Sequence, residues 1–239
     1  MTFSKQTHSE SDRRPFKVLF LDIDDTLLDF EANARLAMKN AFLDFGLPFS
    51  ERSFRLFEER NLALWKRLER KEITKQELFY LRWRIIFSEL GLDADPDAFE
   101  QSFLKGLENA VVPIPGAAEL VAKLSGTYRL CAASNGMRHQ QVERLKKAGM
   151  YGAMEHVFVS ETIGFEKPSA PFFDYCFRVL RDVKPEETLM IGDSVTADIK
   201  GALAYGIPCI WFDRYRTRAT PPEGVLAAVQ DLNELYDYL

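Results

Sequence analysis

Residues 18–26 read VLFLDIDDT, a continuous apolar run that ends in carboxylates spaced two residues apart. Strands of a parallel sheet are covered on both faces, so this run predicts a buried strand over 17–22. Asp22 would then stand at the carboxyl end of the strand, the edge where open α/β sheets bind ligands. Because Asp22 and Asp24 repel each other, a hard cation such as Mg²⁺ would suit them. The simpler alternative is a helix cap at Asp24 followed by a turn.

A second predicted strand also ends in an acid. The apolar run 189–191 is followed, after one glycine, by Asp193, and a helical stretch carrying Asp198 then closes at Gly206. Taken alone, the residues after this strand would pass as ordinary turn chemistry. Because parallel strands present their carboxyl ends at one edge, Asp193 is instead expected to face the same ligand as Asp22.

Two further strand ends add a hydroxyl and a cation. The predicted strand 128–133 leads into Ser134 and Asn135 and then into a helix, where a hydroxyl and backbone amides suit a phosphate. Lys167 follows another predicted strand, 156–160. Singly, Ser134 could be an N-cap and Lys167 a solvated amine. Four such strand ends in this order are hard to obtain from turn chemistry alone.

Together these residues resemble the haloacid dehalogenase superfamily of aspartate-dependent phosphatases, over residues 16–212. The family's four motifs are matched, in chain order, by Asp22, Asp24 and Thr26, by Ser134, by Lys167, and by Asp193 with Asp198. More narrowly, the chain is similar to the noncanonical pyrimidine 5'-nucleotidases, because Asp25 stands where many superfamily members carry glycine and Asn135 follows Ser134.

The resemblance implies a Mg²⁺-dependent phosphomonoester hydrolase that acts through an aspartyl-phosphate intermediate. Asp22 would be the nucleophile, and Asp24 would serve first as general acid and then as general base. Ser134, Asn135 and Lys167 would bind the phosphate. The substrate is expected to be a small phosphorylated molecule, a pyrimidine nucleoside 5'-monophosphate in the narrower resemblance.

The resemblance also implies how the metal is held. Mg²⁺ would be bound by Asp22, by the backbone carbonyl of Asp24 and by Asp193. Asp198 is expected to orient these ligands or Lys167 rather than to bind the metal directly.

Other functions stay open on the sequence. A sugar-phosphate or phosphoglycolate phosphatase, or a phosphomutase, would have the same four motifs and would differ in the contacts of its cap. Dehalogenation is disfavoured, because a departing halide does not need the proton that Asp24 supplies. An inactive phosphate-binding module is a different class, and the complete set of motif residues argues against it.

The periodicity of the chain changes from strand to helix after Asp29. Apolar residues at helical spacing continue to about residue 110, and Thr74 with Glu77 forms a capping box within this stretch. We therefore predict an α/β fold with a Rossmann-like parallel sheet and an inserted all-helical cap. The predicted boundaries are 16–29 and 113–239 for the core, 30–112 for the cap and 1–15 for a flexible leader.

The aromatic residues of this insertion are expected to form mostly the core of the cap, with one or two lining a substrate pocket. They include Phe54, Phe57, Trp65, Phe79, Trp83 and Phe87. Since the four motifs recognise only phosphate and metal, substrate choice is expected to depend on the cap.

The composition limits the possible partners. With 239 residues, 46% of them hydrophobic, the chain can bury one large core and a smaller helical unit, yet no apolar run reaches the roughly 18 residues of a membrane span. The polar N-terminus lacks the apolar centre of a signal peptide, which favours the cytoplasm. A net charge of -5 disfavours a nucleic-acid polymer.

Two smaller groups of residues receive plain interpretations. Cys131, Cys176 and Cys209 lie far apart without metal-ligand spacing and are expected to be buried apolar residues. The basic run of Arg214, Arg216 and Arg218 is interpreted as a solvated loop unless it borders the site.

Overall fold

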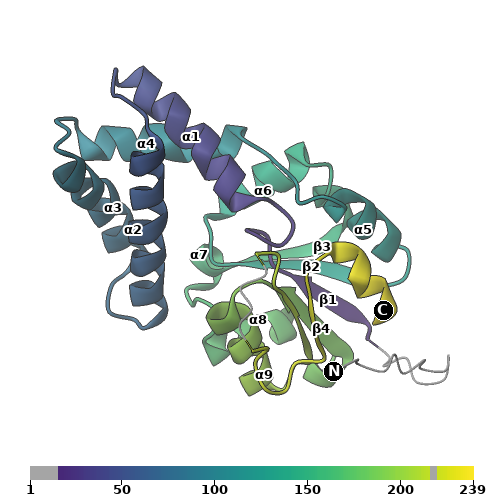
Figure 1. Ribbon diagram of the computed structural model, residues 1–239. Helices are drawn as coiled ribbons and strands as arrows, with labels where there is room; N and C mark the ends of the chain where they lie inside the picture. Colours follow the sequence, from purple (N-terminus) through teal and green to yellow (C-terminus); the bar gives the residue numbers. More distant parts are fainter. Residues whose placement is uncertain (1–15, 216–219) are drawn as a thin grey trace.

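The computed structural model describes residues 16–215 and 220–239. Its centre is a six-stranded parallel sheet in the order β3-β2-β1-β4-β5-β6 (Figure 1). The strands are β1 (Val18–Leu21), β2 (Arg129–Ser134), β3 (Met154–Val159), β4 (Thr188–Gly192), β5 (Cys209–Phe212) and β6 (Ala227–Val229). Because β1 lies between β2 and β4, segments remote in sequence end side by side at one edge of the sheet.

The predicted Rossmann-like sheet with inserted helices is confirmed, and the four predicted strands correspond to β1 to β4 with ends shifted by one or two residues. The shift in β1 is small in physical terms. Lys17 N and Asp22 N still donate to Glu187 O and Ile191 O, at 2.7 and 3.0 Å. Asp22 is therefore still held by the sheet while its side chain stands at the sheet's edge.

Helices cover both faces of the sheet (Figure 1). Leu19 and Leu21 of β1 face the layer of α5 (Ala117–Leu124) and α6 (Arg138–Lys147), whereas Val18 and Phe20 face α8 (Ala170–Val179) and α9 (Gly201–Tyr205). This alternation is the two-residue period of a strand buried on both sides. The shorter elements are η2 (Tyr151–Ala153), α7 (Ser160–Ile163), η3 (Pro185–Glu187), the π-helix η4 (Val195–Lys200) and η5 (Leu232–Asp237).

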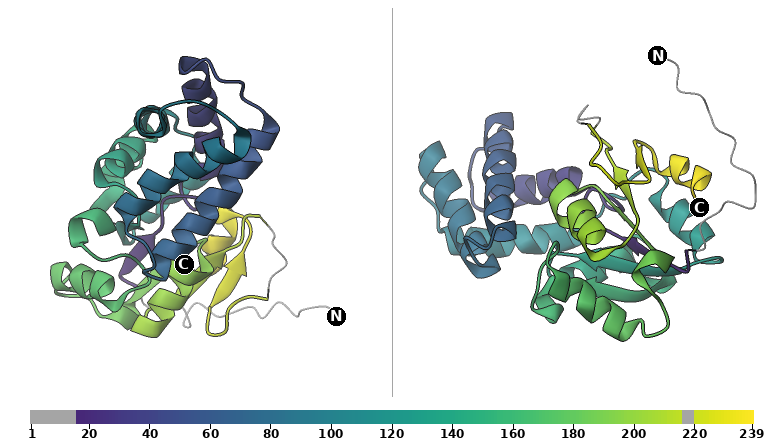
Figure 2. Two further views of the ribbon diagram at one scale, coloured as in Figure 1. Left: turned by 90° about the vertical axis from the view of Figure 1, so that its left-hand side faces the viewer. Right: turned by 90° about the horizontal axis from the view of Figure 1, so that it is seen from below.

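Four helices inserted after β1 stand apart from the sheet, beyond the carboxyl ends of its strands (Figures 1 and 2). They are α1 (Phe30–Asp44), α2 (Glu51–Glu69), α3 (Lys75–Leu90) and α4 (Pro96–Asn109). The predicted capping box of Thr74 and Glu77 begins α3, and Gly91 ends it with a φ of 66°. The two connections to the core run side by side, since Asp29 N donates to Val112 O at 2.8 Å. The boundaries at 30 and 112 remain predictions.

Several expectations concern residues around these elements. The three cysteines are buried and unpaired, as expected. Across residues 16–215 and 220–239, no helix is long and apolar enough to cross a membrane. The predicted leader 1–15, together with Arg216 and Arg218, lies outside the described residues.

Candidate active site

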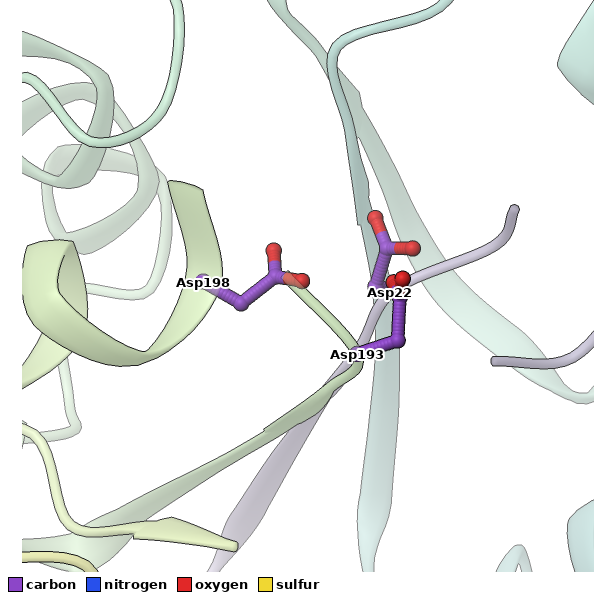
Figure 3. A group of neighbouring side chains, drawn as sticks. All are labelled: Asp22, Asp193 and Asp198. Atoms are coloured by element: carbon purple, nitrogen blue, oxygen red, sulfur yellow. The ribbon is translucent and has the colours of Figure 1, made fainter. Parts of the chain in front are cut away.

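Three carboxylates meet at the carboxyl ends of β1 and β4. One oxygen from each of Asp22, Asp193 and Asp198 lies within 4.8 Å of the other two (Figure 3). Asp22 follows β1, Asp193 follows β4, and Asp198 comes from η4. Asp22 and Asp198 are buried and Asp193 is half-buried. The fold thus brings together the acids that the sequence predicted at separate strand ends.

Lys167 is the cation inside this cluster. Its Nζ donates to Asp22 Oδ1 at 2.7 Å, to Asp198 Oδ1 at 2.6 Å and to the carbonyl of Ala133 at 2.5 Å. Burial would lower the pKa of Lys167, but the carboxylates of Asp198 and Asp22 outweigh burial and raise it. The ammonium stays charged, and three acceptors satisfy its three N–H groups.

The charge balance of the cluster fits a divalent cation. Three carboxylates and one ammonium would leave an excess of two negative charges in a buried place. Burial raises the pKa of Asp22 to about 8 against the opposing effect of Lys167, and burial with Asp22 and Asp198 raises that of Asp193 well above its usual range. A doubly charged cation would offset the repulsion between the carboxylates, and a site with only oxygen ligands suits Mg²⁺.

The hydrogen bonds separate the three acids into two kinds. Asp198 has both oxygens engaged, Oδ1 by Lys167 and Oδ2 by the backbone N–H of Ser194 at 3.0 Å. Asp22 has Oδ1 engaged by Lys167, and its Oδ2 has no hydrogen-bond donor among the described residues. The same holds for the Asp193 carboxylate. The oxygens free for a metal or a phosphate therefore belong to Asp22 and Asp193.

Ser134 and Asn135 lie at the end of β2, beside this cluster. Ser134 Oγ accepts hydrogen bonds from Gly136 N at 3.0 Å and from Gln141 Nε2 at 2.9 Å. The Asn135 amide is occupied differently, because it exchanges two 2.9 Å hydrogen bonds with the backbone N–H and C=O of Lys167. Asn135 thus fixes the segment that carries Lys167, and only its backbone N–H is left to contact a phosphate.

Asp24 has two partners on α6 that sequence reasoning missed. Its Oδ1 accepts from Arg144 Nη1 at 2.6 Å, and its Oδ2 accepts from Gln141 Nε2 at 2.5 Å. Gln141 and Arg144 are buried. The available signal was their spacing of three residues, which places them on one helix face. Because α6 is rich in charged residues, its sequence alone suggests a solvent-exposed helix.

The loop after β5 also borders the site. Tyr215 Oη donates to Asp25 Oδ1 at 3.0 Å, and Arg214 Nη2 donates to Asp29 Oδ2 at 2.7 Å. Arg214 is therefore part of the site's rim rather than a solvated loop residue. Burial and the neighbouring Asp24 raise the pKa of Asp25 to about 6, against the opposing effect of Tyr215 and Arg214.

A cavity of about 500 Å³ extends from these acids into the cap. On the cap side its lining includes Phe54, Phe57, Asn61 and Trp65, all from α2. Of the six cap aromatics, Trp83 and Phe87 are core residues as expected, while Trp65 is half-buried at the cavity.

The connection between α2 and α3 contacts the core on two sides of this cavity. Thr196 Oγ1 donates to Glu69 Oε2 at 2.6 Å, and Lys75 Nζ donates to Ser160 Oγ at 2.8 Å. Glu69 ends α2 and Lys75 begins α3, so this end of the cap contacts η4 on one side and α7 on the other. These contacts bring the apolar face of α2 over the acidic edge of the sheet.

Comparisons with known proteins identify relatives along most of this chain. The family model of haloacid dehalogenase-like hydrolases matches residues 16–206. The HAD-hydrolase YfnB of Bacillus subtilis is 33% identical over 94% of this chain and 95% of its own. Its structure, solved with bound magnesium, superposes with a TM-score of 0.88 and covers 92% of this chain and 97% of that one.

Two further relatives differ in the substrate that their names give. The pyrimidine 5'-nucleotidase PynA of Streptococcus pneumoniae is 35% identical over 93% of this chain and 95% of its own. The glyceraldehyde 3-phosphate phosphatase of Methanothermobacter thermautotrophicus is 30% identical over 85% of this chain and 88% of its own.

Proposed function

This chain belongs to the haloacid dehalogenase-like hydrolases and is a phosphatase of that family, and we propose that it hydrolyses pyrimidine nucleoside 5'-monophosphates. The observation that carries the proposal is the cavity of about 500 Å³ that joins the acids to aromatic residues of α2. Such a volume suits a nucleoside, whereas a triose phosphate would leave most of it to water. The half-buried ring of Trp65 at this cavity can stack on a flat base. A cytoplasmic location is part of this proposal.

In the first chemical step, Asp22 attacks phosphorus. Lys167 holds Asp22 Oδ1 at 2.7 Å, which leaves Oδ2 as the attacking oxygen. A bond forms between Oδ2 and phosphorus while the bond from phosphorus to the nucleoside 5'-oxygen breaks. The departing alkoxide takes a proton from the carboxyl group of Asp24.

In the second step, water hydrolyses the aspartyl-phosphate. Asp24, now a carboxylate, takes a proton from the water, whose oxygen bonds to phosphorus as the bond to Asp22 Oδ2 breaks. Inorganic phosphate leaves and both side chains return to their starting states. Ser134 Oγ and the backbone N–H of Asn135 hold phosphate oxygens through both steps.

Asp193, the backbone carbonyl of Asp24 and Asp22 would hold Mg²⁺, Asp22 through Oδ1, which accepts a single hydrogen bond from Lys167 and keeps a free lone pair, while Asp198 fixes Lys167. When bound, Mg²⁺ supplies positive charge that offsets the repulsion between carboxylates and phosphate. The separation of roles follows the hydrogen bonds, since both oxygens of Asp198 are already engaged.

A panel of phosphomonoesters tests this function. With Mg²⁺ present, kcat/KM should be higher for the monophosphates of uridine, deoxyuridine and thymidine than for glyceraldehyde 3-phosphate, phosphoglycolate or hexose phosphates. Equal or faster turnover of the small phosphates would overturn the nucleotidase assignment and favour a sugar-phosphate phosphatase with the same chemistry. Absence of Mg²⁺-dependent phosphate release from every compound would overturn the mechanism itself.

A further inference from the structure

The cap contains an ion pair that its own stability does not explain. Arg82 of α3 and Glu100 of α4 form a bidentate pair, with Nε to Oε2 at 3.1 Å and a shorter contact from Nη2 to Oε1. Their side chains are only 2% and 6% exposed. Burying two charges costs several kcal/mol per ion, so a well-packed apolar pair would often stabilise a core as well or better. Its presence calls for another role.

The third group that this pair engages is Asn61. Arg82 Nη1 donates to Asn61 Oδ1 at 3.0 Å. A guanidinium can only donate, so the amide atom facing it must be the oxygen. The orientation of the amide is therefore fixed, and Nδ2 lies on its other branch. No acceptor for Nδ2 is found within residues 16–215 and 220–239, although Asn61 is only 6% exposed.

Asn61 also lines the cavity above the acids. Phe57, Asn61 and Trp65 are spaced four residues apart, which places them on one face of α2. Phe57 is stacked on Trp83 with ring centroids 5.5 Å apart and is fixed from behind. Trp65 has no ring partner among the described residues and is half-buried at the cavity. The wall thus offers the partly exposed indole of Trp65 and, one helical turn away, one oriented N–H donor.

We propose that Asn61 determines substrate specificity by donating a hydrogen bond from Nδ2 to a ring carbonyl of the pyrimidine base. Arg82 and Glu100 are positioning residues that hold the amide in this orientation. The inference rests on the proposed nucleotidase function and identifies the side chain that recognises the base. A phosphate ester without a carbonyl at this place leaves the Nδ2 donor to water and forgoes this hydrogen bond, so its kcat/KM should be lower.

The test compares uridine 5'-monophosphate with ribose 5-phosphate, which has a similar sugar phosphate and no base. Asn61→Asp keeps an oxygen for Arg82 but replaces the N–H donors with a second acceptor. The ratio of the two kcat/KM values should fall by about 10- to 100-fold, the range for losing a hydrogen bond and leaving a partner unpaired. Asn40→Asp, at an exposed position of α1, is the matched control and should leave the ratio unchanged.

A second variant tests the positioning role without leaving a buried charge. Arg82→Met combined with Glu100→Leu removes both charges, so the cap should stay folded while the Asn61 amide loses its anchor. The same ratio should fall, mainly through a higher KM for uridine 5'-monophosphate. A melting temperature near that of the wild type verifies the fold.

Two contrary results have different meanings. If the wild type does not prefer uridine 5'-monophosphate over ribose 5-phosphate, the nucleotidase proposal fails and takes this inference with it. If the wild type shows that preference but Asn61→Asp keeps it in full, the nucleotidase proposal stands and the role of Asn61 is overturned.

Discussion

Arg144 Nη1 donates to Asp24 Oδ1 at 2.6 Å and links a buried cation of α6 to the carboxylate after β1. The guanidinium is 1% exposed, and its Nε and Nη2 have no hydrogen-bond partner among the described residues. Asp24 is the one carboxylate in the described part of the chain that forms an ion pair with it. A buried cation with so few partners is costly. We infer that Arg144 positions Asp24 for proton transfer.

We expect Arg144→Met to lower kcat by about 10- to 100-fold with a smaller change in KM. This range corresponds to the 1.5–3 kcal/mol of a hydrogen bond to a charged group. Substrates with poor alkoxide leaving groups should lose more activity than aryl phosphates, because only the former depend on the proton from Asp24. Steady-state kinetics on one alkyl and one aryl phosphate measure both effects.

Two companion variants distinguish positioning from general damage to α6. Arg144→Lys should recover part of the lost kcat, since it keeps a cation near Asp24. Arg138→Met removes an exposed arginine of the same helix, which donates to Val157 O, and should leave kcat unchanged. A uniform loss on alkyl and aryl substrates would contradict the positioning role.

Asp22→Asn should abolish turnover, because an amide is a poor nucleophile and a weaker metal ligand. The variant should stay folded, since the Asn side chain can still accept a hydrogen bond from Lys167. Acid quenching after mixing with radiolabelled substrate should trap phosphorylated protein in the wild type and none in the variant. Retention of a tenth of the wild-type rate would remove Asp22 from the role of nucleophile.

Mg²⁺ should stabilise the wild type and leave Asp193→Ala little changed. At about 100 times its dissociation constant, a ligand adds about 2.7 kcal/mol, which corresponds to a rise in Tm of roughly 5 to 11 °C for a chain of this size. Without Mg²⁺ the variant should melt no lower than the wild type, because it lacks a half-buried carboxylate that Asp22 and Asp198 repel. Differential scanning calorimetry with and without Mg²⁺ makes the comparison. Tight Mg²⁺ binding by the variant would show that Asp193 is not a metal ligand.

The sheet and the acids were predictable because they depend on local patterns. A buried parallel strand appears as a short apolar run, and the residue after it must lie at the edge of the sheet. Asp22, Ser134 and Asp193 could therefore be identified from their neighbours in sequence. Lys167 follows the same logic, although only the fold shows that its ammonium lies between two carboxylates.

The missed residues act through contacts between distant parts of the chain. Gln141 and Arg144 meet Asp24 across 117 and 120 positions, and Tyr215 meets Asp25 across 190. Periodicity shows that a helix has a buried face, but it does not say which strand end that face will meet. The polar composition of α6 and of the loop after β5 predicted that both would be exposed to solvent. In the structure, part of each packs against the acidic edge of the sheet.

Gly136 provides a last test of the link between α6 and Asp24. A Cβ at this position would lie 2.4 Å from Gln141 Nε2, the atom that contacts both Asp24 and Ser134. We expect Gly136→Ala to push the Gln141 amide aside and lower kcat by about tenfold, the loss of one hydrogen bond to a charged group. Gly152→Ala is the matched control, since nothing lies within 4 Å of its Cβ, and its kcat should equal that of the wild type. Full activity in Gly136→Ala, with Gln141→Leu equally active, would show that Asp24 does not need its hydrogen bond from Gln141.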